Sequence, residues 1–252
     1  RFAPILYRRW VIPPKLEELW GLSSRGAEAL ARKESNDCGL CGAKLRARRL
    51  ARVLLNRYPI GSPPAPARSV RAWVRSPEIQ TLRVAEINRV DGLHAELARL
   101  PGLAYSEYLE GVEPGTIQDG VRCEDLTRLT YPDASFDLIV TSETLEHVPD
   151  LSAALSEVRR VLAPDGQHLF TVPIAPGVPT TFARASLSLD GKIQHHATPI
   201  CHPGGDSGYP VFTEFGTDLP ERLQDAGFDV VVYFGPATED DIAQVFACRL
   251  AR

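Results

Sequence analysis

The amino-acid sequence predicts an α/β fold: a seven-stranded, mostly parallel sheet with helices on both faces, preceded by a small N-terminal segment. Two observations support this prediction. Beyond residue 80, strand patterns alternate with helix patterns, which is typical of a parallel sheet covered on both faces. Hydrophobic residues make up 44% and charged residues 24% of the chain, so its composition is that of a globular domain with a large core.

Each element is identified by the spacing of its apolar residues. Apolar runs or alternations predict strands, and apolar residues on one helical face predict helices. Strands are expected at residues 82–87, 103–109, just before 123, 136–141, 167–172, 228–234 and 243–250. Helices are expected at residues 93–100, 151–162 and 217–226. Residues 174–212 show no convincing regular pattern, and an insertion of this length is expected to form a lid or binding loop.

A proline-rich, linker-like stretch at residues 61–67 lies near the end of the N-terminal segment. It predicts a boundary between an accessory segment, residues 1–68, and a main domain, residues 69–252. The accessory segment is expected to contain a helix at residues 43–56, which is basic. The basic residues form either a solvated face or a patch for an acidic substrate. They are Lys44, Arg46, Arg48, Arg49, Arg52 and Arg57.

Cys38 and Cys41 have the spacing of half a zinc site. No second pair of ligands follows nearby, so a complete site would need residues from the insertion. The candidates are Cys201, His202, His195 and His196. The preferred interpretation is two free thiols in a turn, and no metal is expected. Five cysteines are an odd number, which argues against the disulfide framework of a secreted protein.

Charge and hydropathy narrow the class of partner. The formal net charge of −4 argues against a general nucleic-acid binder, and a small-molecule substrate is expected. No apolar run is long enough to span a membrane, and residues 1–14 lack a secretory leader pattern. A cytoplasmic protein is therefore expected, with its oligomeric state left open.

Acidic side chains recur at the ends of the expected strands, where ligands bind in open parallel sheets. These residues are Glu86, Glu107, Asp125 and Glu143. Carboxylates at such a site suit a ligand that offers hydroxyls, amines and positive charge rather than phosphates. S-adenosylmethionine offers a ribose diol, an exocyclic amine, an ammonium and a sulfonium.

Three stretches carry a resemblance to a known family. They are VAEINRVDG at residues 84–92, DLTRLTYPDASFDLIVTSETLEHVP at 125–149 and VRRVLAPDGQHLFTV at 158–172. In this order they resemble the class I S-adenosylmethionine-dependent methyltransferase superfamily, in its UbiE/methyltransferase-11-like branch, which implies a Rossmann-like sheet. Two of the family's motif glycines are Asn88 and Val90 here. Asparagine tolerates a positive φ better than most residues.

The resemblance implies that S-adenosyl-L-methionine is the cofactor and that four groups of residues contact it. They are Glu86, Asn88 and Gly92 around the methionine part, Glu107 at the ribose hydroxyls, Asp125 and Leu126 at the adenine, and Thr141, Ser142 and Glu143 at the methionine end.

Histidines are the candidates for acid–base chemistry. His147 follows the fourth expected strand, near the expected point of methyl transfer, and is interpreted either as a catalytic base or as a packing residue. His195, His196 and His202 lie in the insertion, where they are candidates for substrate contact or for the same catalytic role.

The sequence therefore predicts methyl transfer to a small hydroxyl- or amine-bearing metabolite, such as a sugar or a secondary metabolite, by direct in-line attack. Two alternatives stay open. The replaced glycines favour a non-catalytic binding or scaffold protein on the same fold. The basic helix favours a nucleic-acid methyltransferase, although the overall acidity of the chain does not.

Overall fold

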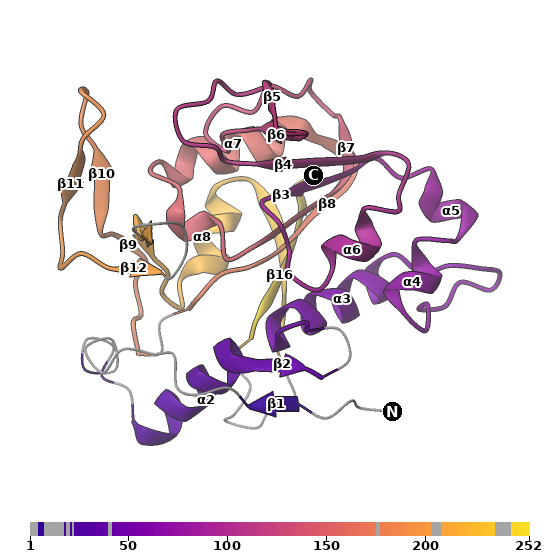
Figure 1. Ribbon diagram of the computed structural model, residues 1–252, viewed down its shortest axis with the longest axis horizontal. Helices are drawn as coiled ribbons and strands as arrows, with labels where there is room; N and C mark the ends of the chain where they lie inside the picture. The colour runs from indigo at the N-terminus through magenta and orange to yellow at the C-terminus, as the bar shows by residue number, and fades with distance from the viewer. Residues whose placement is uncertain are drawn as a thin grey trace.

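The protein is built around one large sheet (Figure 1). A computed structural model describes residues 5–7, 18, 21, 23–39, 42–174, 177–202, 208–234 and 243–252. The strands of the large sheet are β3 (Val84–Ile87), β4 (Leu103–Glu107), β5 (Ile117–Gln118), β6 (Val121–Cys123), β7 (Phe136–Ser142), β8 (Leu162–Thr171), β15 (Phe228–Tyr233) and β16 (Val245–Leu250). Their order across the sheet is β15-β16-β8-β7-β3-β4-β6-β5.

The strand directions confirm the predicted mostly parallel α/β sheet. The strands β6, β4, β3, β7 and β8 run parallel to one another, whereas β16 pairs antiparallel with both β8 and β15. These are the seven expected strands. The eighth, β5, is a two-residue hairpin partner of β6. Both of its residues are exposed, so no apolar pattern marked it in the sequence.

Helices cover both faces of this sheet. They are α3 (Leu45–Arg57), α4 (Val70–Trp73), α5 (Pro77–Gln80), α6 (His94–Leu97), α7 (Leu151–Val161) and α8 (Leu219–Asp225). Helix α2 (Ser24–Ser35) contacts α3, and η1 (Leu145–His147) is a 3-10 turn. One apolar core joins α7 and α8 to one face of the sheet, and a second joins α3–α6 to the other. Among the described residues, no helix has the length and apolar character that crossing a membrane requires.

The basic helix α3 is part of the second core. Its Leu50, Val53 and Leu54 are buried in the same apolar cluster as Val84 and Leu138 of the central strands. Period-two alternation explains this contact, because every second side chain of a strand faces the same side of the sheet. Helix α3, which precedes residue 68, therefore covers part of one face of the sheet. That residues 69–252 form a separate domain stays a prediction.

The insertion contains regular structure, so the expectation that residues 174–212 lack it is wrong for the described part. Its strands are β9 (Phe182–Ala183), β10 (Ala185–Leu187), β11 (Ile193–His195), β12 (Cys201–His202) and β13 (Tyr209–Pro210), and β14 (Thr213–Glu214) follows. The antiparallel pairs are β10 with β11, β12 with β13, and β9 with β14. The β10–β11 hairpin projects from the body at the left of Figure 1. Strands of two or three residues are too short to produce a detectable apolar period.

Candidate functional site

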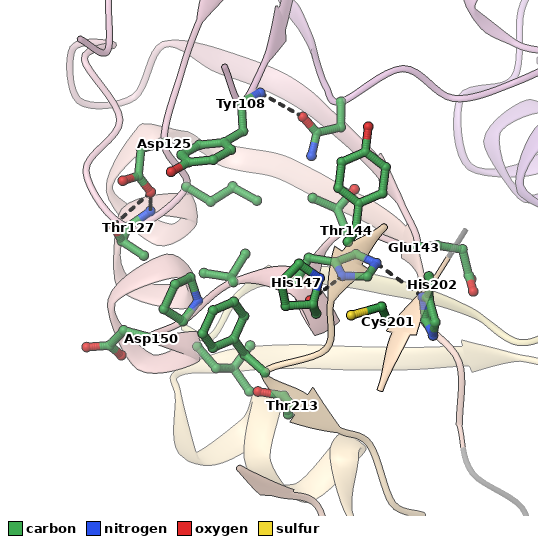
Figure 2. A pocket seen from close by; sticks show the side chains of 18 of the residues that line it. Tyr108, Asp125, Thr127, Glu143, Thr144, His147, Asp150, Cys201, His202 and Thr213 are labelled. Carbon is green, nitrogen blue, oxygen red and sulfur yellow. Dashed lines mark hydrogen bonds between the residues drawn. The ribbon is translucent and has the colours of Figure 1, made fainter. Parts of the chain in front are cut away.

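A cavity of about 2170 Å³ lies at the carboxyl ends of the parallel strands. The residues that follow β3, β4, β6 and β7 line one wall, and the insertion lines the other (Figure 2). The parallel register explains this meeting, because it aligns Glu86 with Tyr105 and Glu107 with Cys123, so neighbouring strands end together. Small-molecule sites typically occupy about 300–1,000 Å³, so this cavity has room for a cofactor and an acceptor.

Glu86 is turned away from this cavity. Its carboxylate is fully buried, accepts a hydrogen bond from the Val90 backbone N–H at 2.8 Å, and lies 2.7 Å from Nδ1 of His94. Burial raises the pKa of Glu86 above its ordinary value. In this structure the carboxylate holds the loop after β3 in shape, and it is not among the side chains that line the cavity.

Asn88 occupies one of the family's glycine positions and lines the cavity. Its φ is +59°, in the left-handed region, and its Oδ1 accepts a hydrogen bond from the Tyr108 backbone N–H at 3.0 Å. The turn after β3 is thus formed without glycine. Gly92 has a different place: a Cβ there would lie 2.3 Å from Cβ of Ala43, so the glycine permits close packing of the N-terminal segment. Gly92 does not line the cavity.

Glu107 and Asp125 line the cavity together with Leu126. Oε1 of Glu107 accepts hydrogen bonds from the Arg89 backbone N–H at 3.1 Å and from the Tyr105 hydroxyl. Oδ1 of Asp125 accepts two hydrogen bonds from Thr127, one from the backbone N–H and one from the hydroxyl, both at 2.8 Å. The two carboxylates are therefore oriented before any ligand arrives.

The three residues expected at the methionine end are placed differently from one another. Thr141 is buried within β7, where its hydroxyl lies 2.9 Å from Nε2 of His168, and it does not line the cavity. Ser142 and Glu143 do line it. Glu143 has a φ of +50°, and its Oε2 lies 3.5 Å from Nζ of Lys33. A carboxylate is therefore present where the strand ends, as expected.

The structure brings His147 and His202 together, although 55 residues separate them (Figure 2). Nε2 of His147 lies 3.1 Å from Nδ1 of His202, and the two rings are nearly perpendicular. Nδ1 of His147 lies 2.7 Å from the Pro210 carbonyl oxygen. A carbonyl only accepts, so Nδ1 carries the proton and Nε2 presents its lone pair. Burial lowers the pKa of His147, which favours this neutral form.

Glu146 completes a cluster that the sequence analysis missed. Its side chain is fully buried, and its Oε1 lies 3.7 Å from both Nε2 of His147 and Nδ1 of His202. Neither carboxylate oxygen has a hydrogen-bond partner among the described residues. Burial, with Glu143 adding to it, raises the pKa of Glu146 well above its usual range, against the opposing charges of Lys33 and Arg46. The only sequence signal was its position beside His147.

The remaining candidates are spread around the molecule. His195 and His196 are exposed and do not line the cavity; Nε2 of His196 lies 2.9 Å from the Ser186 hydroxyl. Cys38 is buried, whereas Cys41 lies outside the described residues.

The basic helix is divided between two roles. Lys44 and Arg46 line the cavity. In contrast, Arg49 donates to the Ala243 carbonyl and Arg57 to Oε1 of Gln167, so these two side chains attach α3 to the sheet.

The middle of the chain is similar in sequence to known methyltransferases. A family model described as a methyltransferase domain matches residues 92–170. Over 92 residues, 36% of this chain, the sequence is 35% identical to the malonyl-[acyl-carrier protein] O-methyltransferase of Halorhodospira halophila (strain DSM 244 / SL1). Over 98 residues, 39% of this chain, it is 33% identical to the glycine/sarcosine/dimethylglycine N-methyltransferase of Actinopolyspora halophila. The matches cover only 28% and 14% of these two relatives.

Two solved structures resemble the chain at lower identity. An S-adenosylmethionine-dependent methyltransferase from Mesorhizobium loti is 20% identical, with a TM-score of 0.43 over 71% of this chain and 94% of that chain. The 1,6-didemethyltoxoflavin-N1-methyltransferase of Burkholderia thailandensis is 15% identical, with a TM-score of 0.46 over 98% of this chain and 95% of that chain. The matched segment lies within the α/β sheet described above, and residues 92–170 of the chain are similar to a methyltransferase domain.

Proposed function

We propose that this protein transfers a methyl group from S-adenosyl-L-methionine to a small-molecule acceptor inside the cavity. The observation that carries the proposal is the arrangement of carboxylates and histidines around the cavity. Oriented carboxylates follow the parallel strands, and a pair of histidines lies on the same cavity. The first group suits the cofactor, and the second marks the acceptor end.

The cofactor is assigned to the wall formed by the strand ends. Glu107 accepts from the ribose hydroxyls, and Asp125 accepts from the adenine amine with Leu126 beside the ring. Glu143 faces the positively charged methionine end, since its carboxylate lines the cavity where β7 ends. Asn88 supplies the turn that lets the backbone come close to the ligand. Glu86 and Gly92 contribute by shaping this loop rather than by contact.

The acceptor is assigned to the wall formed by the insertion. We assign it to the class of small metabolites that offer a hydroxyl or an amine, because the insertion end of the cavity carries the two histidines together with hydroxyl side chains such as Thr198 and Tyr209, which can hydrogen-bond such groups. The names of the two relatives include an O-methyltransferase and an N-methyltransferase, so both kinds of acceptor atom occur around this sequence segment. Lys44 and Arg46 on the same cavity favour an acceptor that also carries an acidic group.

The reaction is a direct displacement. A lone pair of the acceptor oxygen or nitrogen attacks the methyl carbon, the carbon–sulfur bond breaks, and its electron pair stays on sulfur, which leaves S-adenosylhomocysteine. The protein contributes orientation and exclusion of water. Nε2 of His147 presents the lone pair that a base requires, but it faces His202. A proton can reach it from an acceptor only if that pair opens.

Calorimetry with S-adenosylmethionine and S-adenosylhomocysteine tests the cofactor assignment. Glu107→Gln and Asp125→Asn each remove one charged acceptor at the ligand wall, and each should weaken binding by on the order of 5- to 150-fold, the equivalent of about 1–3 kcal/mol. Asp165→Asn is the control, because this carboxylate is exposed and does not line the cavity. The proposal fails if the parent protein binds neither ligand, or if both variants bind as the parent does.

A further inference from the structure

We propose that Glu146, His147 and His202 form a binding site for a divalent first-row transition-metal ion of the zinc type, at the boundary between the methyltransferase core and the insertion. Two imidazoles and one carboxylate are a known protein ligand set for catalytic zinc, with the remaining position open to water or substrate. The sequence analysis expected no metal, because it looked for four ligands around Cys38 and Cys41.

The distances among the three side chains match this ligand set. Zinc–nitrogen bonds of about 2.0–2.1 Å and zinc–oxygen bonds of about 2.0–2.2 Å at tetrahedral angles place ligand atoms roughly 3.3–3.5 Å apart. The two histidine nitrogens are 3.1 Å apart, and each lies 3.7 Å from Oε1 of Glu146. Movements of a few tenths of an ångström bring all three onto one ion.

The protonation state of His147 also fits. A metal-binding histidine usually donates its other ring N–H to a carbonyl or carboxylate, which fixes the tautomer and the ring orientation. Nδ1 of His147 lies 2.7 Å from the Pro210 carbonyl, so Nε2 presents its lone pair to the cluster. Pro210 lies on β13, the strand that pairs with β12, which carries His202. One strand pair therefore supplies both a ligand and the group that orients the other histidine.

The buried carboxylate is the second, independent observation. Glu146 is fully buried, and within the described part of the chain neither of its oxygens has a hydrogen-bond partner. Such a group costs free energy whether it is charged or protonated, because neither form makes its hydrogen bonds. Its Oε1 is directed at the two histidines. A bound cation gives this carboxylate the partner that the described side chains do not provide. Lys33 and Arg46 oppose a cation electrostatically, and Glu143 favours one.

The ligands come from two parts of the fold. Glu146 and His147 lie in η1, directly after the central strand β7, whereas His202 lies in the insertion. The Phe212 backbone N–H donates to the Glu146 carbonyl at 2.8 Å and already holds the two parts together at this point. Metal binding therefore links the insertion to the core and stabilises the wall of the cavity.

The chemical consequence rests on the proposed methyl transfer. His147 and His202 line the cavity, so an open coordination position can take the acceptor oxygen. Coordination lowers the pKa of a bound hydroxyl. A hydroxyl held there would lose its proton to solvent more easily, and its oxygen would then attack the methyl carbon, with the electron pair of the carbon–sulfur bond left on sulfur. The metal ion keeps its oxidation state, and neither histidine needs to act as a free base.

Titration of the chelator-treated full chain with Zn²⁺ at pH 7.5 tests the site by calorimetry. The parent is expected to bind one equivalent and to show a higher Tm when it is loaded, because the ion binds the folded state. Glu146→Gln and His202→Ala should weaken Zn²⁺ binding by more than the roughly 10–100-fold that loss of an outer partner costs. They should also abolish the rise in Tm. A parent that binds no Zn²⁺, or variants that bind it equally well, would overturn the proposal.

Matched controls separate this site from others. His196→Ala removes an exposed histidine of the same insertion, and Cys38→Ser and Cys201→Ser remove described thiols. All three should bind Zn²⁺ as the parent does, and loss of binding in a thiol variant would overturn the ligand assignment. Circular dichroism of each metal-free variant shows that it folds, and His202→Gln replaces His202→Ala if the latter does not. Binding of S-adenosylhomocysteine by metal-free protein is measured separately, so failure of cofactor binding and failure of metal binding are distinguishable.

Discussion

At the scale of single residues, the side chain of Asn88 supports a turn for which the motif of the resembled family uses glycine. Asn88 holds a φ of +59° after β3, and its side-chain oxygen accepts from the Tyr108 N–H. Asparagine tolerates the left-handed region better than most residues, and this hydrogen bond ties the turn to the next strand. Loss of the motif glycine at this position therefore does not remove the turn, which weakens the scaffold alternative that the replacement suggested.

His168 is the residue whose surroundings most directly predict how the free energy of unfolding depends on pH. Its ring is fully buried on β8 and stacks on Phe170 with 4.6 Å between centroids, and its Nδ1 has no hydrogen-bond partner in the described ranges. Burial opposes the charged imidazolium and lowers the pKa of His168 to about 3. An unfolded histidine titrates near 6.5, so below that pH the unfolded chain binds more protons than the folded one. Above pH 6.5 the neutral His168 ring therefore does not reduce the free energy of unfolding. As the pH falls from 6.5 towards 3, the free energy of unfolding decreases progressively.

We expect His168→Gln to lose less stability than the parent on acidification. Between pH 6.5 and pH 5 the parent should lose about 2 kcal/mol more of its free energy of unfolding than the variant, at up to about 1.4 kcal/mol per pH unit. Urea unfolding at several pH values measures this difference. His196→Gln is the control, because its ring is exposed. Parallel pH profiles for the parent and His168→Gln would contradict the expectation.

At the scale of elements, a buried ion pair joins the insertion to the strand β14 that follows it. Arg184 lies between β9 and β10, and its guanidinium donates to the Glu214 carboxylate and, at 2.6 Å, to the Thr198 carbonyl. Both side chains of the pair are almost fully buried. The Arg184 backbone also donates to the Phe212 carbonyl at 2.7 Å and accepts from the His196 N–H. This single position therefore connects three segments of the cavity wall.

Removal of one partner of this pair should be costly. Arg184→Met leaves Glu214 buried and unpaired, and we expect the free energy of unfolding to fall by about 3–5 kcal/mol. The double variant Arg184→Met/Glu214→Leu should recover part of that loss, because no charge is then left buried. Lys192→Met breaks the exposed Lys192–Asp190 pair of the same insertion and should leave the free energy of unfolding almost unchanged. Chemical denaturation of the four proteins decides the matter, and similar losses for Arg184→Met and Lys192→Met would refute this account.

At the scale of the whole molecule, the sheet depends on residues far from it in sequence. The α3 side chains Leu50, Val53 and Leu54 are almost completely buried against the central strands. Tyr58 donates from its hydroxyl to the Asp137 carbonyl at 2.8 Å, and Arg57 to Gln167 at 2.6 Å. One face of the sheet would thus expose a broad apolar surface if this region were absent.

We therefore expect residues 69–252 alone to lack a cooperative unfolding transition, even though the proline-rich stretch predicts a boundary at residue 68. In the full chain, Leu54→Ala should lower the free energy of unfolding by about 2–5 kcal/mol, because it removes a buried side chain and leaves a cavity. Arg52→Ala on the exposed face of the same helix should have little effect. A stable, cooperative 69–252 fragment would instead establish the first 68 residues as an accessory segment.

The sequence by itself predicted the chain order of seven of the eight strands of the large sheet and of helices α3, α6, α7 and α8. It also predicted the end of the sheet at which the cavity lies and the positions of Asn88, Glu107 and Asp125 along that end. Residues close together in sequence set the apolar periodicity that marks each strand and helix. The chain order of these elements then indicates at which end of a parallel sheet the strand-end residues lie. The same local reasoning placed a helix at residues 43–56, which the structure has at Leu45–Arg57. It could not show that this helix completes the core of the sheet.

Only the tertiary structure decided which side chains face the cavity and which meet across it. Glu86 is turned inward because the Val90 N–H and His94 bind its carboxylate, and the strand pattern contains no information about that. Glu146, His147 and His202 come together because the insertion folds back over η1, which joins residues 55 positions apart. Burial and distance between such residues depend on the packing of the whole chain, so no local pattern specifies them.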